Sequence, residues 1–216
     1  MTYSQSYQDI FALQICKNKT YIEIGANRPI KRNNTFLLEK KGFKGFSIEY
    51  SKKWQTSWKN SKRSNKIYFA DAMKFNYEQA IQTLRMTNSF GYLSCDIEPN
   101  TATFQALKHV IDSGIDFECI TFEHDLYTSK KDIRYKVDKY LIDKGYKIAV
   151  TDVYLQPDKN KLYETWYIKN SIEFEQNQKS QNIKTIKILP QNMKIMKIMK
   201  NQLILYKVLK ILNVVD

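Results

Sequence analysis

The chain has 216 residues, of which 43% are hydrophobic and 26% are charged, and its net charge is +13. These values indicate a globular protein with a sizeable core and exclude a wholly disordered chain. No apolar run approaches the roughly eighteen residues of a transmembrane helix. The N-terminus also lacks the basic region and apolar core of a signal peptide, so we expect a cytoplasmic protein.

The positive charge has two interpretations. A net charge of this size favours polyanionic partners such as nucleic acid, acidic glycans or an anionic membrane surface. Lysine is also abundant throughout the chain, so the charge can equally reflect an ordinary solubilising surface. Charge alone therefore leaves the class of partner open.

Cysteine and histidine usage restricts the metal and disulfide chemistry. The three cysteines are widely spaced in sequence and form no CxxC pair, and the only histidines are His109 and His124. This pattern is typical of buried thiols in a reducing compartment, and it disfavours a disulfide framework or a zinc site. His109 falls in the middle of a predicted helix, where we expect a structural or surface role.

From residue 20 to residue 170, apolar strand-like runs alternate with amphipathic segments, which predicts βα units around a parallel sheet. The predicted strands are Thr20–Ile24, Gly45–Glu49, Lys66–Ala70, Tyr92–Ile97, Phe117–Phe122, Tyr146–Val153 and Leu162–Ile168. The predicted helices are Asn34–Lys41, Ser51–Asn60, Tyr77–Arg85, Thr101–Asp112 and Lys131–Lys144.

The last two predicted strands are joined by the turn-rich segment QPDKN at 156–160, which is too short for a crossover helix. They should therefore form an antiparallel pair at the edge of the sheet. The fold class predicted is α/β: a Rossmann-like, seven-stranded, mostly parallel sheet with an antiparallel final hairpin and helices on both faces.

The composition changes near residue 170, so we assign residues 1–170 to the folded domain and 171–216 to a linker and tail. Residues 173–182 are polar and rich in Gln and Asn, and lysines then recur among Ile, Met and Leu. Residues 191–212 can form a basic amphipathic helix. Such a helix makes peripheral contact with a membrane, docks on a partner, or packs back on its own domain.

In an open α/β sheet, ligands bind beyond the carboxyl ends of the strands, where the strand order reverses. The first predicted strand is followed by Gly25, although the GxGxxG and P-loop patterns are absent. Five successive strands have an acidic residue at or near the carboxyl end, and gathering such groups requires a cation, hydroxyl groups or shared protons. A nucleotide-like ligand is therefore predicted. The acidic residues are Glu23, Glu49, Asp71, Asp96, Glu98, Glu123 and Asp125.

Four segments together resemble the FkbM-type methyltransferase family. They are residues 4–11 (SQSYQDIF), 21–27 (YIEIGAN), 33–40 (NNTFLLEK) and 45–49 (GFSIE). The resemblance covers roughly residues 4–168 and leaves the tail outside. It implies an S-adenosylmethionine-dependent methyltransferase that mostly methylates hydroxyl groups, often on sugars or small metabolites.

The resemblance also implies roles for individual residues in binding S-adenosylmethionine. The expected methionine-binding residues are Glu23, Gly25 and Asn27. Glu49 is expected to bind the ribose diol, and Asp71 with Ala72 the adenine. Asp96 is expected beside the sulfonium at the end of the fourth strand.

An acceptor hydroxyl must be deprotonated during transfer, and His124 is the best general base by intrinsic pKa. We predict His124 and Asp96 as catalytic residues, with a structural histidine as the alternative for His124. Asp96, Glu98, His124 and Asp125 can alternatively gather Mg²⁺, which prefers oxygen ligands and lowers the pKa of a bound hydroxyl.

Two other functions remain open. An RNA or DNA methyltransferase would use the positive charge and stacking aromatic residues such as Trp54 and Trp58. Against this, the segment DIEP at 96–99 differs from the Asn/Asp-Pro-Pro-aromatic loop of amino-group methylases. A binding protein that keeps the fold without catalysis is the third possibility.

Overall fold

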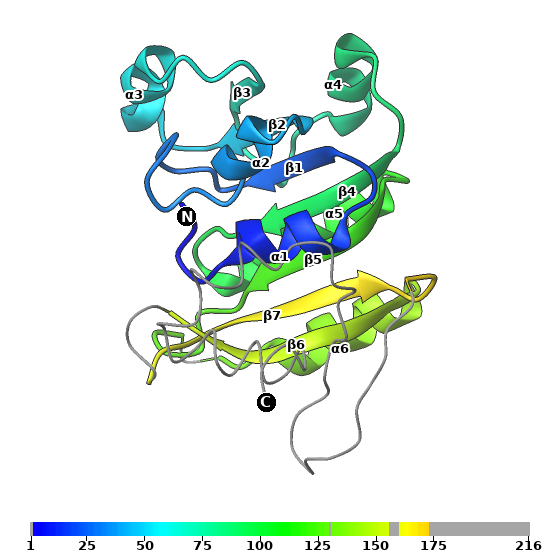
Figure 1. Ribbon diagram of the computed structural model, residues 1–216. Coiled ribbons are helices and arrows are strands. Elements are labelled where there is room, and N and C mark those ends of the chain that lie inside the picture. Colours follow the sequence, from blue (N-terminus) through cyan, green and yellow to red (C-terminus); the bar gives the residue numbers. More distant parts are fainter. Residues whose placement is uncertain (1, 130, 156–159, 173–216) are drawn as a thin grey trace, which may run out of the picture.

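The computed structural model describes residues 2–129, 131–155 and 160–172 (Figure 1). The predicted tail helix over 191–212 and most of the turn at 156–160 lie outside the described residues. Within the described ranges, no helix combines the length and apolar character needed to cross a bilayer.

Seven strands form one sheet in the order β3-β2-β1-β4-β5-β7-β6. Strands β1 to β5 pair in parallel, and β7 pairs antiparallel with both β5 and β6, so the predicted seven-stranded sheet with a final antiparallel hairpin is confirmed. The strand bounds are β1 Thr20–Ile24, β2 Lys44–Glu49, β3 Lys66–Phe69, β4 Ser89–Cys95, β5 Asp116–Glu123, β6 Tyr146–Tyr154 and β7 Leu162–Lys169.

The helices cover both faces of the sheet (Figure 1). Apolar side chains of α1 and α2 pack in one core cluster, and those of α4, α5 and α6 pack in another. The sheet lies between these clusters, which is the layer arrangement predicted. The helix bounds are α1 Gln8–Ile15, α2 Phe36–Lys40, the 3-10 helix η1 Lys52–Trp54, α3 Gln55–Asn60, α4 Tyr77–Leu84, α5 Asn100–Asp112 and α6 Arg134–Asp143.

Local sequence explains most of these elements. The central strands are nearly continuous apolar runs because both of their faces are covered, as β1 (TYIEI) illustrates. Helix α5 buries Leu107 and Val110 on one face and is followed by Gly114 at φ +79°. The Asn76 side chain caps α4 by accepting a hydrogen bond from the Gln79 N–H at 2.9 Å.

Helix α1 is absent from our sequence predictions. It has only eight residues, so its apolar periodicity spans barely two turns, and tertiary contacts hold it in place. Ile10 and Phe11 are buried, and the Phe11 and Trp166 ring centroids are 4.6 Å apart. Helix α6 begins at Arg134, later than predicted, where the Asp132 carboxylate accepts the Arg134 N–H at 3.0 Å.

All three cysteines are free thiols, and those of Cys95 and Cys119 are buried. Cys16 and Cys119 are separated by about a hundred residues in sequence, yet their Sγ atoms lie 3.4 Å apart where α1 ends above β5. Of the two roles expected for His109, structural or surface, the contacts favour the structural one, because its Nε2 lies 2.9 Å from the Phe75 carbonyl oxygen and its ring packs on Tyr77.

Candidate functional site

The strand order reverses between β1 and β4, and Gly25 lies at this point. Its φ is +82°, and a Cβ built on it would lie 1.6 Å from the Asp96 carbonyl oxygen. Only glycine both adopts this conformation without strain and allows such a close approach of the two chain segments. The glycine therefore sets the narrow crevice between the carboxyl ends of the two strands.

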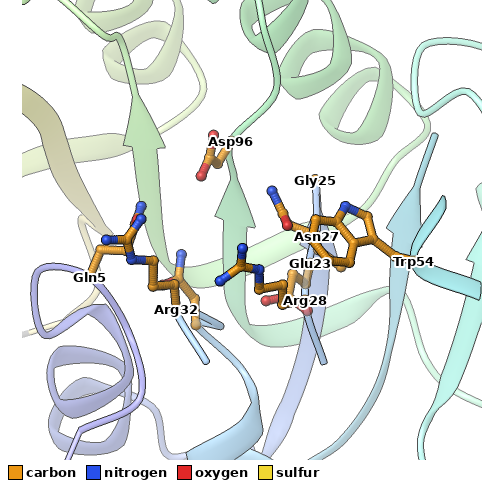
Figure 2. Close-up of a pocket in the computed structure, with 10 residues that line it drawn as sticks. Gln5, Glu23, Gly25, Asn27, Arg28, Arg32, Trp54 and Asp96 are labelled. Atoms are coloured by element: carbon orange, nitrogen blue, oxygen red, sulfur yellow. The ribbon is translucent and has the colours of Figure 1, made fainter. Parts of the chain in front are cut away.

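A cavity of about 170 Å³ opens at this crevice (Figure 2). Small-molecule pockets usually measure about 300–1,000 Å³, so a nucleotide-sized ligand would extend beyond this cavity along the edge of the sheet. The lining residues come from the N-terminal segment, β1 and its loop, η1 and the end of β4. They are Gln5, Glu23, Gly25, Ala26, Asn27, Arg28, Arg32, Asn34, Trp54 and Asp96.

Glu23 is a buried carboxylate in the floor of this site. Its Oε2 accepts hydrogen bonds from the Thr35 hydroxyl at 2.8 Å and the Ser47 hydroxyl at 2.7 Å. Burial raises the pKa of Glu23, while the positive charge of Arg63 and these hydrogen bonds act in the opposite direction. The predicted binding residue is thus held in one orientation by its neighbours.

Arg63 ties the loop after β1 to the rest of the domain. Its side chain is 1% exposed and forms an ion pair with Glu39 at 2.8 Å. It also donates hydrogen bonds to the Pro29 carbonyl oxygen at 3.1 Å and the Asn33 Oδ1 at 2.9 Å. An arginine has five N–H donors in a fixed plane, so one side chain can fix several points of a loop.

Glu49 ends β2 and bridges two loops beside the cavity. Its Oε2 accepts the Asn27 N–H at 2.7 Å, and its Oε1 accepts the Ser51 N–H at 2.6 Å. A carboxylate has about four acceptor positions, so two remain for hydroxyl groups of a ligand. Glu49 lies next to the cavity and is not part of its lining.

Asp71 and Ala72 follow β3 and do not line the cavity. Asp71 is partly exposed, and its Oδ1 accepts the Met73 N–H at 2.9 Å. Ala72 is buried, and its carbonyl oxygen accepts a hydrogen bond from the Tyr77 hydroxyl at 3.1 Å. Both residues lie at the same edge of the sheet as Glu49, one strand farther out.

Three carboxyl groups meet behind the cavity: those of Asp96, Glu123 and Asp125. Burial, together with the charges of Asp125 and Glu98, raises the pKa of Asp96 to about 6. Burial and the neighbouring carboxylates raise the pKa of Glu123 well above its usual range. Glu123 Oε2 and Asp125 Oδ1 have no hydrogen-bond donor among the described residues, and the raised pKa of Glu123 favours its protonated form beside Asp96. Of the three, Asp96 lines the cavity.

A hydrogen bond connects the N-terminal segment to this acidic group. The Gln5 Nε2 donates to the Tyr163 hydroxyl at 2.8 Å, and Tyr163 contacts Glu123. Gln5 and Asp96 line the same cavity, so a chain of buried polar groups joins two of its walls. This segment is anchored by Asp9, whose Oδ2 accepts the Tyr3 N–H at 2.8 Å.

His124 is placed differently from what a general base requires. It is 1% exposed, and it is not part of the cavity lining. Its Nδ1 accepts the Leu126 N–H at 3.3 Å, and its Nε2 has no partner among the described residues. Burial, with the nearby positive charge of Arg134, lowers the pKa of His124 to about 4. Its predicted catalytic role therefore gains no geometric support.

The predicted magnesium site also gains none. Within the described ranges, Asp96, Glu98, His124 and Asp125 form no grouping that could hold a metal ion. Glu98 is exposed, whereas Asp125 is buried in contact with Glu123, so the four side chains do not converge.

No family model and no curated protein matches the chain in sequence. Among solved structures, it is similar to an S-adenosylmethionine-dependent methyltransferase from Clostridium acetobutylicum, with 13% identity and a TM-score of 0.51 over 78% of this chain and 92% of that one. A putative rRNA-methylase from Clostridium thermocellum gives 13% identity and a TM-score of 0.52 over 80% of this chain and 100% of that one.

TrmK from M. capricolum, in complex with S-adenosylhomocysteine, gives 10% identity and a TM-score of 0.52 over 82% of this chain and 74% of that one. At such low sequence identity, the similarity to these structures shows a common fold. The chain has the S-adenosylmethionine-dependent methyltransferase fold.

Several cavity residues of this methyltransferase fold escape sequence reasoning. Gln5, Arg28, Arg32 and Asn34 carry no motif of their own, and only the tertiary structure shows that they line the same cavity as Asp96. The one available signal was their position in or near segments that resemble FkbM-type enzymes.

Two aromatic residues considered for stacking are placed differently in the methyltransferase fold. Trp54 lines the cavity. Trp58 is 5% exposed, donates its Nε1–H to the Asn27 carbonyl oxygen at 2.8 Å and packs under Arg63. The interpretation of Trp58 as a surface stacking residue is therefore wrong, because its ring is used to hold the loop after β1.

Proposed function

We propose that this protein is an S-adenosylmethionine-dependent methyltransferase acting on a hydroxyl group of a small acceptor, such as a sugar or metabolite. The observation that carries the proposal is the cavity between the ends of β1 and β4, with Gly25 and Asp96 facing each other across the point where strand order reverses. The resemblance of residues 4–168 to FkbM-type enzymes supports the same assignment of cofactor and acceptor.

The residues of the site fit the cofactor. Gly25 allows the backbone at Asp96 to approach the end of β1, because a Cβ at this position would lie 1.6 Å from the Asp96 carbonyl oxygen, and Glu23 presents a fixed carboxylate beside it. Glu49 keeps two acceptor positions for a ribose diol. The bound cofactor would supply a methyl group that is already activated by the adjacent sulfonium charge.

The chain itself must orient the acceptor hydroxyl and accept its proton. Asp96 has the better geometry for this role, because it lines the cavity whereas His124 does not. With a pKa of about 6, Asp96 is mostly ionised at neutral pH, whereas the raised pKa of Glu123 beside it favours the protonated form of that carboxyl group. We therefore assign Asp96 as the general base.

The cofactor site is tested by titrating the full-length protein with S-adenosylhomocysteine in a calorimeter. We expect saturable binding by the wild type and about a hundredfold weaker binding by Glu49→Gln. The reason is that the two expected hydrogen bonds from the ribose hydroxyls to the charged carboxylate would be lost or weakened. Glu118→Gln is the matched control: Glu118 also accepts two backbone N–H groups, those of Lys17 and Asn18, at the opposite end of the sheet. An absence of binding by the wild type would contradict the methyltransferase proposal.

The base is tested by methyl transfer to a panel of sugars, hydroxy metabolites and RNA. We expect the wild-type rate to be half-maximal near pH 6 and to level off about one pH unit above it, because the ionised form of Asp96 accepts the proton. Asp96→Asn should lower the rate about a hundredfold or more, remove this pH dependence and leave cofactor affinity nearly unchanged. Transfer to RNA alone would replace the small acceptor by a nucleic acid, and binding without transfer would favour a non-catalytic role.

A further inference from the structure

We propose that Arg28 and Arg32 form an anion-binding subsite that holds an oxyanion group of the acceptor, a carboxylate or a phosphate. This inference rests on the proposed function, because the acceptor would occupy the same cavity as Asp96. Both arginines line that cavity, and both side chains are exposed, so they lie on its open side (Figure 2).

Neither arginine has an anionic partner within the described part of the chain. Arg32 forms no ion pair or side-chain hydrogen bond there, and Arg28 contacts the Trp54 ring at 5.2 Å from its centroid. Arg63, by contrast, is buried with an ion pair and several hydrogen bonds. Two unpaired guanidinium groups in one cavity suit an oxyanion, which they can contact through paired N–H donors.

The loop that carries these arginines is held in place before any ligand binds. Trp58 donates to the Asn27 carbonyl oxygen at 2.8 Å, and Arg63 donates to the Pro29 carbonyl oxygen at 3.1 Å. The Asn33 Nδ2 donates to the Ala26 carbonyl oxygen at 3.1 Å. Arg32 itself has a φ of +56°, which is uncommon for a residue with a side chain. A loop fixed in this way loses little conformational freedom when it binds an anion.

The carboxylates of the cavity do not neutralise the pair. Glu23 is occupied by the Thr35 and Ser47 hydroxyls, and its charge is opposed by Arg63. Figure 2 shows Asp96 apart from the two arginine side chains, across the cavity. An acceptor that carries both an anionic group and a hydroxyl could thus reach the arginines with one and Asp96 with the other.

The rival ligand for the arginines is the carboxylate of the cofactor itself. The cofactor has one carboxylate, and it also carries positively charged ammonium and sulfonium groups. One carboxylate cannot neutralise two guanidinium groups, and the two positive groups of the cofactor would add to the repulsion. The two ligands make different predictions, because only the acceptor site remains open once the cofactor is bound.

The test is a titration of the full-length protein with inorganic phosphate and with acetate, with and without saturating S-adenosylhomocysteine. We expect phosphate or acetate to bind the loaded wild type with a dissociation constant of about 1 mM. Arg28→Gln and Arg32→Gln should each weaken this binding about tenfold or more while changing S-adenosylhomocysteine affinity less than about threefold. Whichever anion binds more tightly identifies the group on the acceptor.

Arg85→Gln is the matched control, because Arg85 is also exposed and has a positive φ, of +53°, but lies at the end of α4, outside the cavity. It should leave anion binding unchanged. Equal anion binding by all three variants and the wild type, or none by the wild type, would overturn the proposal.

Titration with 5′-methylthioadenosine, which lacks the amino-acid carboxylate, distinguishes an acceptor anion from the cofactor carboxylate as the ligand of the arginines. If the arginine variants bind S-adenosylhomocysteine about tenfold more weakly and bind 5′-methylthioadenosine as tightly as the wild type does, the arginines bind the cofactor and the inference fails. Arginine-dependent anion binding by a protein that does not bind S-adenosylhomocysteine would support the anion subsite and refute the proposed methyltransferase activity.

Discussion

Gly25→Ala is expected to abolish binding of S-adenosylhomocysteine and to destabilise the domain. The new Cβ would lie 1.6 Å from the Asp96 carbonyl oxygen, so β1 and β4 would have to separate at the crevice. Overpacking of this kind costs about 1–3 kcal/mol or more, in addition to the strain of a positive φ. Urea unfolding measures the change in stability, and calorimetric titration measures the loss of binding.

Gly42→Ala is the control variant, because it has the strain of a positive φ without the steric clash. Gly42 has a φ of +86°, and nothing lies within 4 Å of a Cβ built on it. We expect Gly42→Ala to cost about 1–2 kcal/mol from strain alone and to leave ligand binding intact. If the two glycine variants are equally stable and both bind, the close approach of the two strands does not shape the site.

Arg63→Met is expected to lower the free energy of unfolding by about 3–5 kcal/mol, because it leaves the half-buried carboxylate of Glu39 and the buried carboxylate of Glu23 without their positive partner. It also removes the contacts to the Pro29 carbonyl oxygen and Asn33, so the loop after β1 should lose its fixed position. Urea unfolding measures the stability, and amide hydrogen exchange measures the opening of the loop.

Arg134→Met is the control for the loss of an arginine. Arg134 pairs with Asp132 at 2.8 Å, with side chains 33% and 46% exposed, and such exposed pairs contribute about 0.2–1 kcal/mol. We therefore expect a small change in stability and normal exchange in the loop after β1. A similar loss of stability in both variants would mean that burial of Arg63 adds nothing to its contribution.

The methyltransferase assignment depends on features of different strength. The cavity at the reversal of strand order is a property of the fold, which many activities share. Gly25, Glu49 and the pair formed by Asp96 and Glu123 are specific features of this chain at that place. The two cavity arginines are a further specific feature, on which the proposed anionic group of the acceptor rests.

Sequence patterns located the strands of this protein because their apolar runs are buried on both faces and are bounded by turn residues. The same patterns placed Gly25 and Glu49 at the carboxyl ends of β1 and β2, where the structure shows them. Helix α5 was also predictable, because it spans three turns with one apolar face. In each case the signal lies within a few residues of the element that it specifies.

Tertiary structure decided the insertion of β7 between β5 and β6, because the pairing partner of a strand depends on contacts between distant segments. It also decided which polar residues share the cavity, since Gln5, Arg32 and Asp96 are brought together only by the packing of the sheet. The buried position of His124 is of the same kind. Local sequence therefore determined the strands and helix α5, whereas long-range packing determined helix α1 and which side chains face the cavity.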